Sequence, residues 1–161
     1  MEKTLNTLSS LKKPLNEVEM SEEIKDKLKI AYMKVAETFA ECSSATRLKV
    51  GAVLIKDTNI ISFSYNGTPS GYPTNDCEDM DGNTKEVVIH AETNLLIKLC
   101  SQGGVGAKDS IMFITHSPCF NCSKLIYQSG IKKVYYKHKY RCTDGLDFLR
   151  EMNIPTEQLN F

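Results

Sequence analysis

The sequence has no excess of charge of either sign, because 20 lysine and arginine residues balance 20 aspartate and glutamate residues in a chain of 161. A protein that coats DNA or RNA needs a large positive excess to displace counterions from many phosphates. We therefore expect no polymeric nucleic acid among its partners. The chain also lacks internal repeats and low-complexity segments, and 41% hydrophobic residues are enough to build a globular core.

Long hydrophobic runs are also missing. No apolar run approaches the roughly 18 residues that span a bilayer, and residues 1–20 are too polar for the core of a signal peptide. We therefore expect a cytoplasmic protein without a membrane partner. Because that compartment is reducing, its cysteines are not expected to form disulfides, and a metal site or catalytic thiol has to be considered. The six cysteines are Cys42, Cys77, Cys100, Cys119, Cys122 and Cys142.

Apolar periodicity divides the chain into an N-terminal extension, residues 1–20, and a single domain, residues 21–161. Ser21 can cap a helix whose apolar residues keep a 3.6-residue period to about Cys42. The later alternation of strands and helices favours a three-layer α/β arrangement, in which the first two strands form a hairpin. Further helices are expected at 90–100, 118–130 (with Pro118 in its first turn) and 143–151, and strands at 49–56, 60–65, 110–115 and 132–138.

Three residues from two separate segments are well suited to bind a metal ion. Cys119 and Cys122 lie three positions apart at the start of an expected helix, so their side chains share one face. The helix N-terminus favours the thiolate form of both. His90 begins another expected helix and adds a nitrogen ligand that suits zinc. Three protein ligands leave the fourth tetrahedral position open for water, which is typical of a catalytic zinc.

Glu92 follows His90 by two residues, so its carboxylate can reach the same site without serving as a fourth ligand. A carboxylate in that place can hydrogen-bond water and move protons. A lone C-x-x-C is also found in structural zinc knuckles and in redox motifs. Here no second C-x-x-C closes an all-cysteine site, and neither His116 nor His138 stands at a finger-like offset. We therefore favour a catalytic zinc.

The segments H-A-E at 90–92 and P-C-F-N-C at 118–122 match the H-x-E and P-C-x-x-C signature of zinc deaminases. On these motifs the sequence resembles the zinc-dependent cytidine/deoxycytidylate deaminase superfamily over roughly residues 22–150. The resemblance implies an α/β/α fold whose central mixed sheet of about five strands is flanked by helices. It also implies one catalytic Zn²⁺ on His90, Cys119 and Cys122, with Glu92 as the proton shuttle.

Two further segments resemble deoxycytidylate deaminases within that superfamily. One is the segment at 47–52, R-L-K-V-G-A, which is similar to the residues that lead into their first strand. There the guanidinium of Arg47 can bind a phosphate through two hydrogen bonds. Without the motif, a solvated arginine is the simpler interpretation. Y-N-G-T-P-S-G at 65–71 is similar to a loop whose asparagine contacts the sugar, although its composition alone indicates only a turn. The resemblance therefore implies sugar binding by Asn66 and an allosteric nucleotide site at Asn66, Gly67, Thr68 and Gly71.

The basic segment at 132–141 has two interpretations. Its lysines suit a protected edge strand. Alternatively, Lys139 and Tyr140 line a nucleotide pocket, as a K-Y pair does in the enzymes that the chain resembles. The resemblance further implies that the backbone N–H of Ala91 and the carbonyl of Ser117 hold the base by its edge.

The activity implied by the resemblance is hydrolytic deamination of dCMP to dUMP and ammonia, which supplies dUMP for dTMP synthesis. Activation by dCTP, inhibition by dTTP, Mg²⁺ bound with the effector, and a homo-oligomer such as a hexamer are implied as well. The alternatives are a tRNA adenosine deaminase, a free-cytidine deaminase and a non-catalytic zinc-stabilised interaction module. The neutral charge argues against tRNA, and a free-cytidine deaminase would not need Arg47.

The remaining cysteines have simpler interpretations. Cys100, on the apolar face of its expected helix, is expected in the core, and Cys42 and Cys142 have no evident role. Cys77 lies near a place where some of the resembled enzymes bind a second, structural zinc, but the sequence shows no partners for it.

Overall fold

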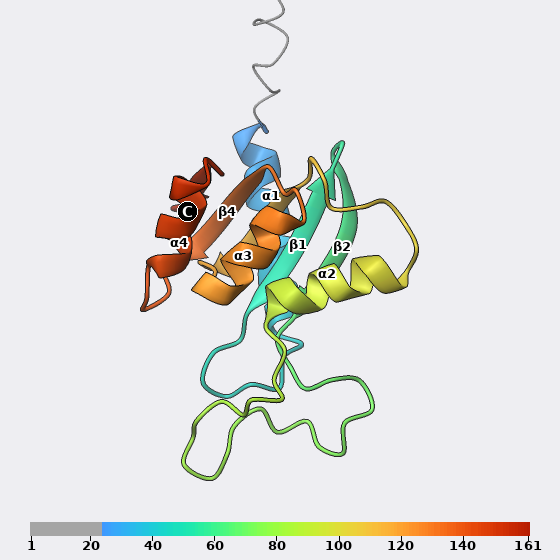
Figure 1. Cartoon of the computed structure of the whole chain (residues 1–161), viewed down its shortest axis with the longest axis vertical. Coiled ribbons are helices and arrows are strands. Elements are labelled where there is room, and N and C mark those ends of the chain that lie inside the picture. Colours follow the sequence, from blue (N-terminus) through green and yellow to red (C-terminus); the bar gives the residue numbers. More distant parts are fainter. Residues whose placement is uncertain (1–23) are drawn as a thin grey trace, which may run out of the picture.

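The computed structural model describes residues 24–161 (Figure 1). The expected extension at 1–20 and the expected cap Ser21 lie outside the described residues. Four helices and five strands follow one another within the described range, in nearly the expected places. In chain order they are α1 (Asp26–Ala40), β1 (Gly51–Lys56), β2 (Asn59–Tyr65), α2 (Ala91–Ser101), β3 (Ile111–His116), α3 (Phe120–Gln128), β4 (Lys133–His138), α4 (Asp144–Glu151) and β5 (Thr156–Gln158).

The five strands form one mixed sheet in the order β2-β1-β3-β4-β5. The hairpin of β1 and β2 is antiparallel, and β1 also pairs antiparallel with β3. β3, β4 and β5 run parallel to one another. The expected mixed sheet is thus confirmed. The edge-strand interpretation of the lysine-rich segment is wrong, because β4 lies between β3 and β5, and its lysines extend from a strand with a partner on each side.

Helices cover both faces of the sheet, which confirms the three layers. In Figure 1, α2 and α3 lie on one face of the sheet and α1 lies on the other. Successive residues of a strand point to opposite faces, so neighbouring residues belong to different halves of the core. Ala52, Leu54, Met112, Ile114, Val134 and Tyr136 pack with apolar residues of α2, α3 and α4. Val53, Ile55, Phe113 and Tyr135 pack with Met33 and Ala36 of α1.

Some local details differ from the sequence-based expectations. The third helix begins at Phe120 and is capped by Cys119, so Pro118 lies before the cap instead of in the first turn. Cys100 is exposed, which contradicts its expected place in the core. The reason is rotational, because α2 buries Leu95 and Leu99, and Cys100 lies about 100° further around the helix. The short strand β5 completes the expected number of about five strands, but the sequence assigned no position to it.

The long connections gather at one end of the sheet. The loop between α1 and β1 and the loop between β2 and α2 lie beside each other below the sheet in Figure 1. α2 and α3 both begin at this end, and their N-termini carry the candidate metal ligands. Among residues 24–161, none of the helices is long and apolar enough to cross a membrane.

Candidate active site

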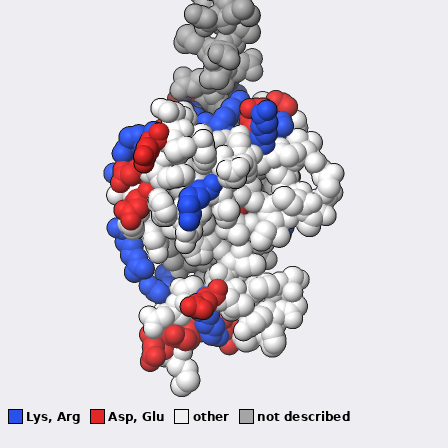
Figure 2. All heavy atoms as spheres, viewed as in Figure 1, with Lys and Arg blue, Asp and Glu red and all other residues white. Residues whose placement is uncertain are grey.

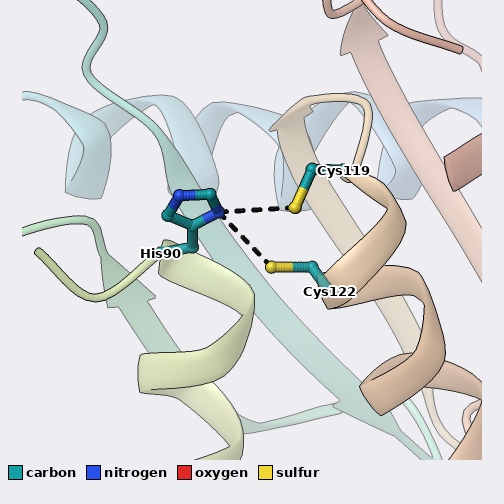
Figure 3. A group of neighbouring side chains, drawn as sticks. All are labelled: His90, Cys119 and Cys122. Carbon is teal, nitrogen blue, oxygen red and sulfur yellow. Dashed lines mark hydrogen bonds between the residues drawn. The ribbon is translucent and has the colours of Figure 1, made fainter. Parts of the chain in front are cut away.

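His90, Cys119 and Cys122 converge in the structure as the sequence predicts (Figure 3). Their ligand atoms lie within 4.8 Å of one another. His90 Nδ1 is 3.6 Å from the Sγ atom of Cys119 and 3.5 Å from that of Cys122. Within the described residues, this is the one group of at least three His, Cys, Asp or Glu side chains close enough to share a metal ion.

Two helix N-termini present these side chains to each other. His90 is the N-cap of α2 and Cys119 is the N-cap of α3. Cys122 lies one turn further into α3 and is buried. Gly145 holds the turn before α3 from the other side, because a Cβ atom at Gly145 would lie 2.1 Å from the carbonyl oxygen of Pro118. Close contact with α4 therefore fixes the path of the chain into Cys119.

The three side chains fit a zinc ion in chemistry and in spacing. One imidazole nitrogen and two sulfurs are a usual ligand set for zinc, and three protein ligands leave one tetrahedral position open. Zn–S bonds of about 2.3 Å and Zn–N bonds of about 2.05 Å, at a tetrahedral angle, place sulfur and nitrogen about 3.6 Å apart. Both sulfur–nitrogen distances in the structure agree with that separation.

The two thiols have opposite protonation preferences. A hydrogen bond from Cys122, with a further contribution from His90, lowers the pKa of Cys119. The same hydrogen bond, together with burial, raises the pKa of Cys122. The lowered pKa of Cys119 favours its thiolate form, which is the form that binds metal ions. The bond to Cys119 also raises the pKa of His90. A strongly held thiolate beside a nitrogen ligand is a ready binding site for a divalent cation.

Glu92 lies in the first turn of α2 and is buried, with 4% of its surface exposed. Burial raises its pKa to about 7, although its own backbone N–H and the neighbouring His90 act in the opposite direction. A carboxyl group whose pKa lies near neutrality can both accept and release a proton, which is the requirement for a proton shuttle.

A cavity of about 750 Å³ opens beside this group. Most of the residues that the sequence assigned to substrate, metal or catalysis lie on its wall. They are Arg47, Asn66, His90, Ala91, Glu92, Ser117, Cys119, Lys139 and Tyr140. Cys122 is not part of the wall but contacts His90 from the buried side. Segments that are far apart in the sequence therefore form the wall of one cavity.

The loop expected to hold effectors lies only partly at the cavity. Asn66 lines the wall, and its side chain is bound to the backbone on both sides of Lys49: Oδ1 accepts from Val50 N–H at 2.8 Å, and Nδ2 donates to the Leu48 carbonyl at 2.9 Å. Gly67 pairs with Ile89 in an isolated bridge. Thr68 donates to the Thr74 carbonyl at 3.1 Å, and Gly71 is in a left-handed turn with a φ of 81°. Gly67, Thr68 and Gly71 are not part of the cavity wall.

The opposite wall comes from the ends of β3 and β4. The hydroxyl of Ser117 accepts a 2.7 Å hydrogen bond from the backbone N–H of Tyr140, and Ser117 N–H donates to the His138 carbonyl at 2.8 Å. These two bonds hold the segment with Lys139 and Tyr140 against the turn that carries Cys119. Lys139 and Tyr140 lie beyond the end of β4.

Sequence reasoning missed several residues of the cavity wall. Glu78, Thr84, Lys85 and Glu86 come from the polar segment before His90. His116 also lines the cavity, and burial, aided by the nearby His138, lowers its pKa. Neither of these histidines joins the metal group. The polar segment has no apolar periodicity from which its position could have been inferred.

The structure also shows where the other cysteines of the described range lie. Cys77 is buried, with its Sγ atom 3.4 Å from the Oγ atom of Ser44. No second metal group was found around it within residues 24–161. Cys42 and Cys142 are exposed. On the face shown in Figure 2, acidic and basic side chains lie close to one another in several places, while the centre of the face is mostly uncharged.

Comparison with known proteins gives the family. Residues 26–138 match the model of the cytidine and deoxycytidylate deaminase zinc-binding region. The chain belongs to this family. As one of these deaminases it is an enzyme, a zinc-dependent hydrolase, and the interaction-module alternative is excluded. The matched range contains the His/Cys/Cys group and Glu92.

Two of the similar proteins are named as deaminases of deoxycytidylate. The dCMP deaminase of cyanophage S-TIM5, solved with dCMP and dUMP, is 46% identical, with a TM-score of 0.83, over 85% of this chain and 100% of that one. The deoxycytidylate deaminase of Mycobacterium phage D29 is 33% identical over 65% of this chain and 90% of its own length. ComE operon protein 2 of Bacillus subtilis is 35% identical over 68% of this chain, which spans 59% of that longer protein.

Proposed function

We propose that this deaminase acts on dCMP and hydrolyses it to dUMP and ammonia. The observation that carries the proposal is one cavity that joins the His/Cys/Cys group and Glu92 to the basic residues Arg47 and Lys139. The first set suits deamination of a cytosine ring, and the second suits a phosphate. The 46% identity to a deaminase solved with dCMP and dUMP supports the same substrate.

The metal ligands of the proposal are His90, Cys119 and Cys122. A zinc ion bound there would activate a water molecule, because zinc lowers the pKa of bound water to about 7. Glu92 then accepts a proton from the attacking water and delivers it to N3 of the cytosine as the new bond forms at C4. Glu92 next takes the proton of the hydroxyl group on C4 and delivers it to the amino nitrogen, so that the C4–N bond breaks, ammonia leaves and the C4 carbonyl of dUMP forms. A pKa that burial raises toward neutrality suits a group that first accepts and then releases a proton.

The substrate contacts follow the walls of the cavity. Ala91 provides the first backbone N–H of α2, which has no partner within the helix and can bind the base, together with the carbonyl of Ser117 on the wall of the same cavity. Asn66 has one N–H left for the sugar after its bonds to the backbone. Arg47 and the pair Lys139 and Tyr140 hold the phosphate.

Wider parts of the proposal rest on the resemblance alone. They are control by dCTP as activator and dTTP as inhibitor with Mg²⁺ at Asn66, Gly67, Thr68 and Gly71, a homo-oligomeric (hexameric) state and supply of dUMP for dTMP synthesis. A cytoplasmic location is proposed from the sequence instead, which has no long apolar run and a polar N-terminal segment. The single domain at 21–161 also remains a prediction.

Ammonia release from a panel of substrates tests the proposal. The zinc-loaded protein is given cytidine, deoxycytidine, CMP, dCMP and dCTP, with and without added dCTP or dTTP as effectors, and a tRNA shift assay at low salt is run beside it. We expect turnover to be fastest with dCMP. Faster turnover of cytidine would favour a free-cytidine deaminase, and tight tRNA binding would favour a tRNA adenosine deaminase.

A further inference from the structure

Glu78 binds the backbone of the turn that carries Arg47. Its carboxylate accepts hydrogen bonds from two consecutive backbone N–H groups, those of Thr46 and Arg47, at 3.1 Å from Oε1 in each case. Oε2 lies 3.2 Å from the same Thr46 nitrogen. Arg47 and Glu78 both line the cavity. The turn that carries Arg47 is therefore tied to a residue 31 positions later in the chain.

The segment around Glu78 is itself held firmly. Glu78 and Thr84 form an antiparallel bridge, and the turn between them is closed by a 2.9 Å bond from Asp79 N–H to the Asn83 carbonyl. Asp79 Oδ1 also accepts from the backbone N–H groups of Asp81 and Asn83, at 2.9 and 2.8 Å. Next to the bridge, the backbone N–H of Lys85 donates a hydrogen bond to the carbonyl of the buried Cys77. Glu78 is thus presented from a small, closed hairpin.

The same hairpin also contacts the side chain of Arg47. The Nη1 atom of Arg47 donates to the Thr84 hydroxyl at 3.4 Å. One strand of the hairpin therefore fixes the backbone of Arg47 through Glu78, and the other meets its guanidinium through Thr84. An exposed arginine otherwise loses considerable rotamer freedom when it binds a ligand, and a group held in advance loses less.

A carboxylate on the wall of a phosphate site normally opposes phosphate binding, because like charges repel. Here burial works to raise the pKa of Glu78, but the backbone N–H groups of Arg47 and Thr46 outweigh it and lower the pKa. The negative charge is directed onto backbone N–H groups of the Arg47 turn. The carboxylate therefore binds the backbone that carries Arg47, which a carboxylate pointing into solvent would not do.

We propose that Glu78 is a positioning residue for phosphate recognition: by capping the N–H groups of Thr46 and Arg47 it sets the direction of the Arg47 guanidinium, with Thr84 as its second support. The proposal rests on the proposed function, since it takes Arg47 as the residue that binds the phosphate of the nucleotide. In this proposal Glu78 acts through Arg47 and not through a contact of its own with the substrate.

The test measures binding of the product pair dUMP and deoxyuridine by calorimetry, because their affinity ratio isolates the phosphate contribution without turnover. We expect Glu78→Gln, which keeps one acceptor oxygen, to lower this ratio by about tenfold, as loss of a charged hydrogen bond does. Thr84→Val, at an exposed position, should lower it in the same direction. In an Arg47→Ala background, Glu78→Gln should have no further effect on the ratio, because the residue through which it acts is gone.

Glu86→Gln is the matched control, because Glu86 lines the same cavity and has the same charge but caps no backbone N–H group of the Arg47 turn. It should not lower the ratio. The proposal is overturned if Glu78→Gln weakens both ligands equally, if its effect persists in the Arg47→Ala background, or if wild-type protein binds dUMP no better than deoxyuridine. Phosphate-dependent binding without dCMP turnover would instead reject the proposed function and leave the positioning role supported.

Discussion

The backbone N–H of Val50 donates a 2.8 Å hydrogen bond to the side-chain oxygen of Asn66, and the Asn66 amide group donates in turn to the carbonyl of Leu48. The residue proposed to hold the sugar thus also fixes the chain just before β1. The same segment continues from Arg47, so Asn66 connects the proposed sugar side of the cavity to its proposed phosphate side.

Asn66→Ala should lower both stability and activity. It leaves the N–H of Val50 and the carbonyl of Leu48 without their partner, and such a loss costs about 1–3 kcal/mol when the groups are buried. Urea unfolding and kcat/KM for dCMP measure the two effects. Asn59→Ala, at the exposed start of β2, the strand that ends just before Asn66, is the control and should change neither by a comparable amount. A fully stable Asn66→Ala protein would contradict the bridging role.

Glu92→Gln should abolish turnover while zinc stays bound. The amide is similar in shape but cannot accept and release a proton near pH 7, so kcat should fall by about 10²–10⁴-fold. Zinc content by elemental analysis and dUMP formation are measured on the same preparation. Normal turnover with full zinc would show that another group shuttles the proton. Glu86→Gln, which removes another carboxylate from the cavity wall, should keep kcat close to wild type.

Cys122→Ala should lose zinc and metal-linked stability together, because a bound metal stabilises the folded state by mass action. A chelator should lower the Tm of the wild type, and the same addition should shift the variant much less. Cys100→Ala is the control, since Cys100 is an exposed cysteine on a neighbouring helix. A Cys122→Ala protein with a full zinc content would disprove the ligand set.

Glu157 should make stability depend on acidic pH. Burial works to raise its pKa, but hydrogen bonds from Lys133 at 2.9 Å and Lys29 at 3.2 Å outweigh that effect and lower the pKa below its ordinary value of 4.5. A carboxyl group whose pKa is lower in the folded state stabilises that state above its unfolded pKa and loses this contribution as the pH falls through its folded pKa. The contribution is therefore complete at neutral pH and disappears in the acid range below 4.5.

Urea unfolding of the wild type and of Glu157→Gln, from neutral pH into that acid range, measures this contribution. We expect the variant to be less stable at neutral pH by about 1 kcal/mol or less, as is usual for a partly exposed ion pair, and the difference to shrink on acidification. Taking the difference removes the effect of acid on the metal site, which both proteins share. Glu151→Gln, at an exposed position of α4, is the control. A difference that grows in acid would contradict a lowered pKa of Glu157 in the folded state.

The sequence by itself determined the chemistry of the site and most of the architecture. His90, Glu92, Cys119 and Cys122 were identified from residue type and spacing, because helical geometry places residues three apart on one face and metal ligation restricts which side chains are useful. Strands and helices with clear periodicity were found within a few residues of their observed bounds. The mixed sheet followed from their order and from the family resemblance.

The tertiary structure alone decided which residues of distant segments meet. Glu78 and Thr84 contact Arg47, and Asn66 binds the backbone of Val50 just before β1. Cys100 lies at the surface. None of these contacts has a local signal, because loops have no periodicity and a hydrogen bond between positions 31 apart depends on how both segments leave the sheet. The neutral charge balance argued against a polymer as substrate, but only folding gathered the basic side chains of Arg47 and Lys139 onto one cavity wall, because the sheet brings the ends of separate strands together.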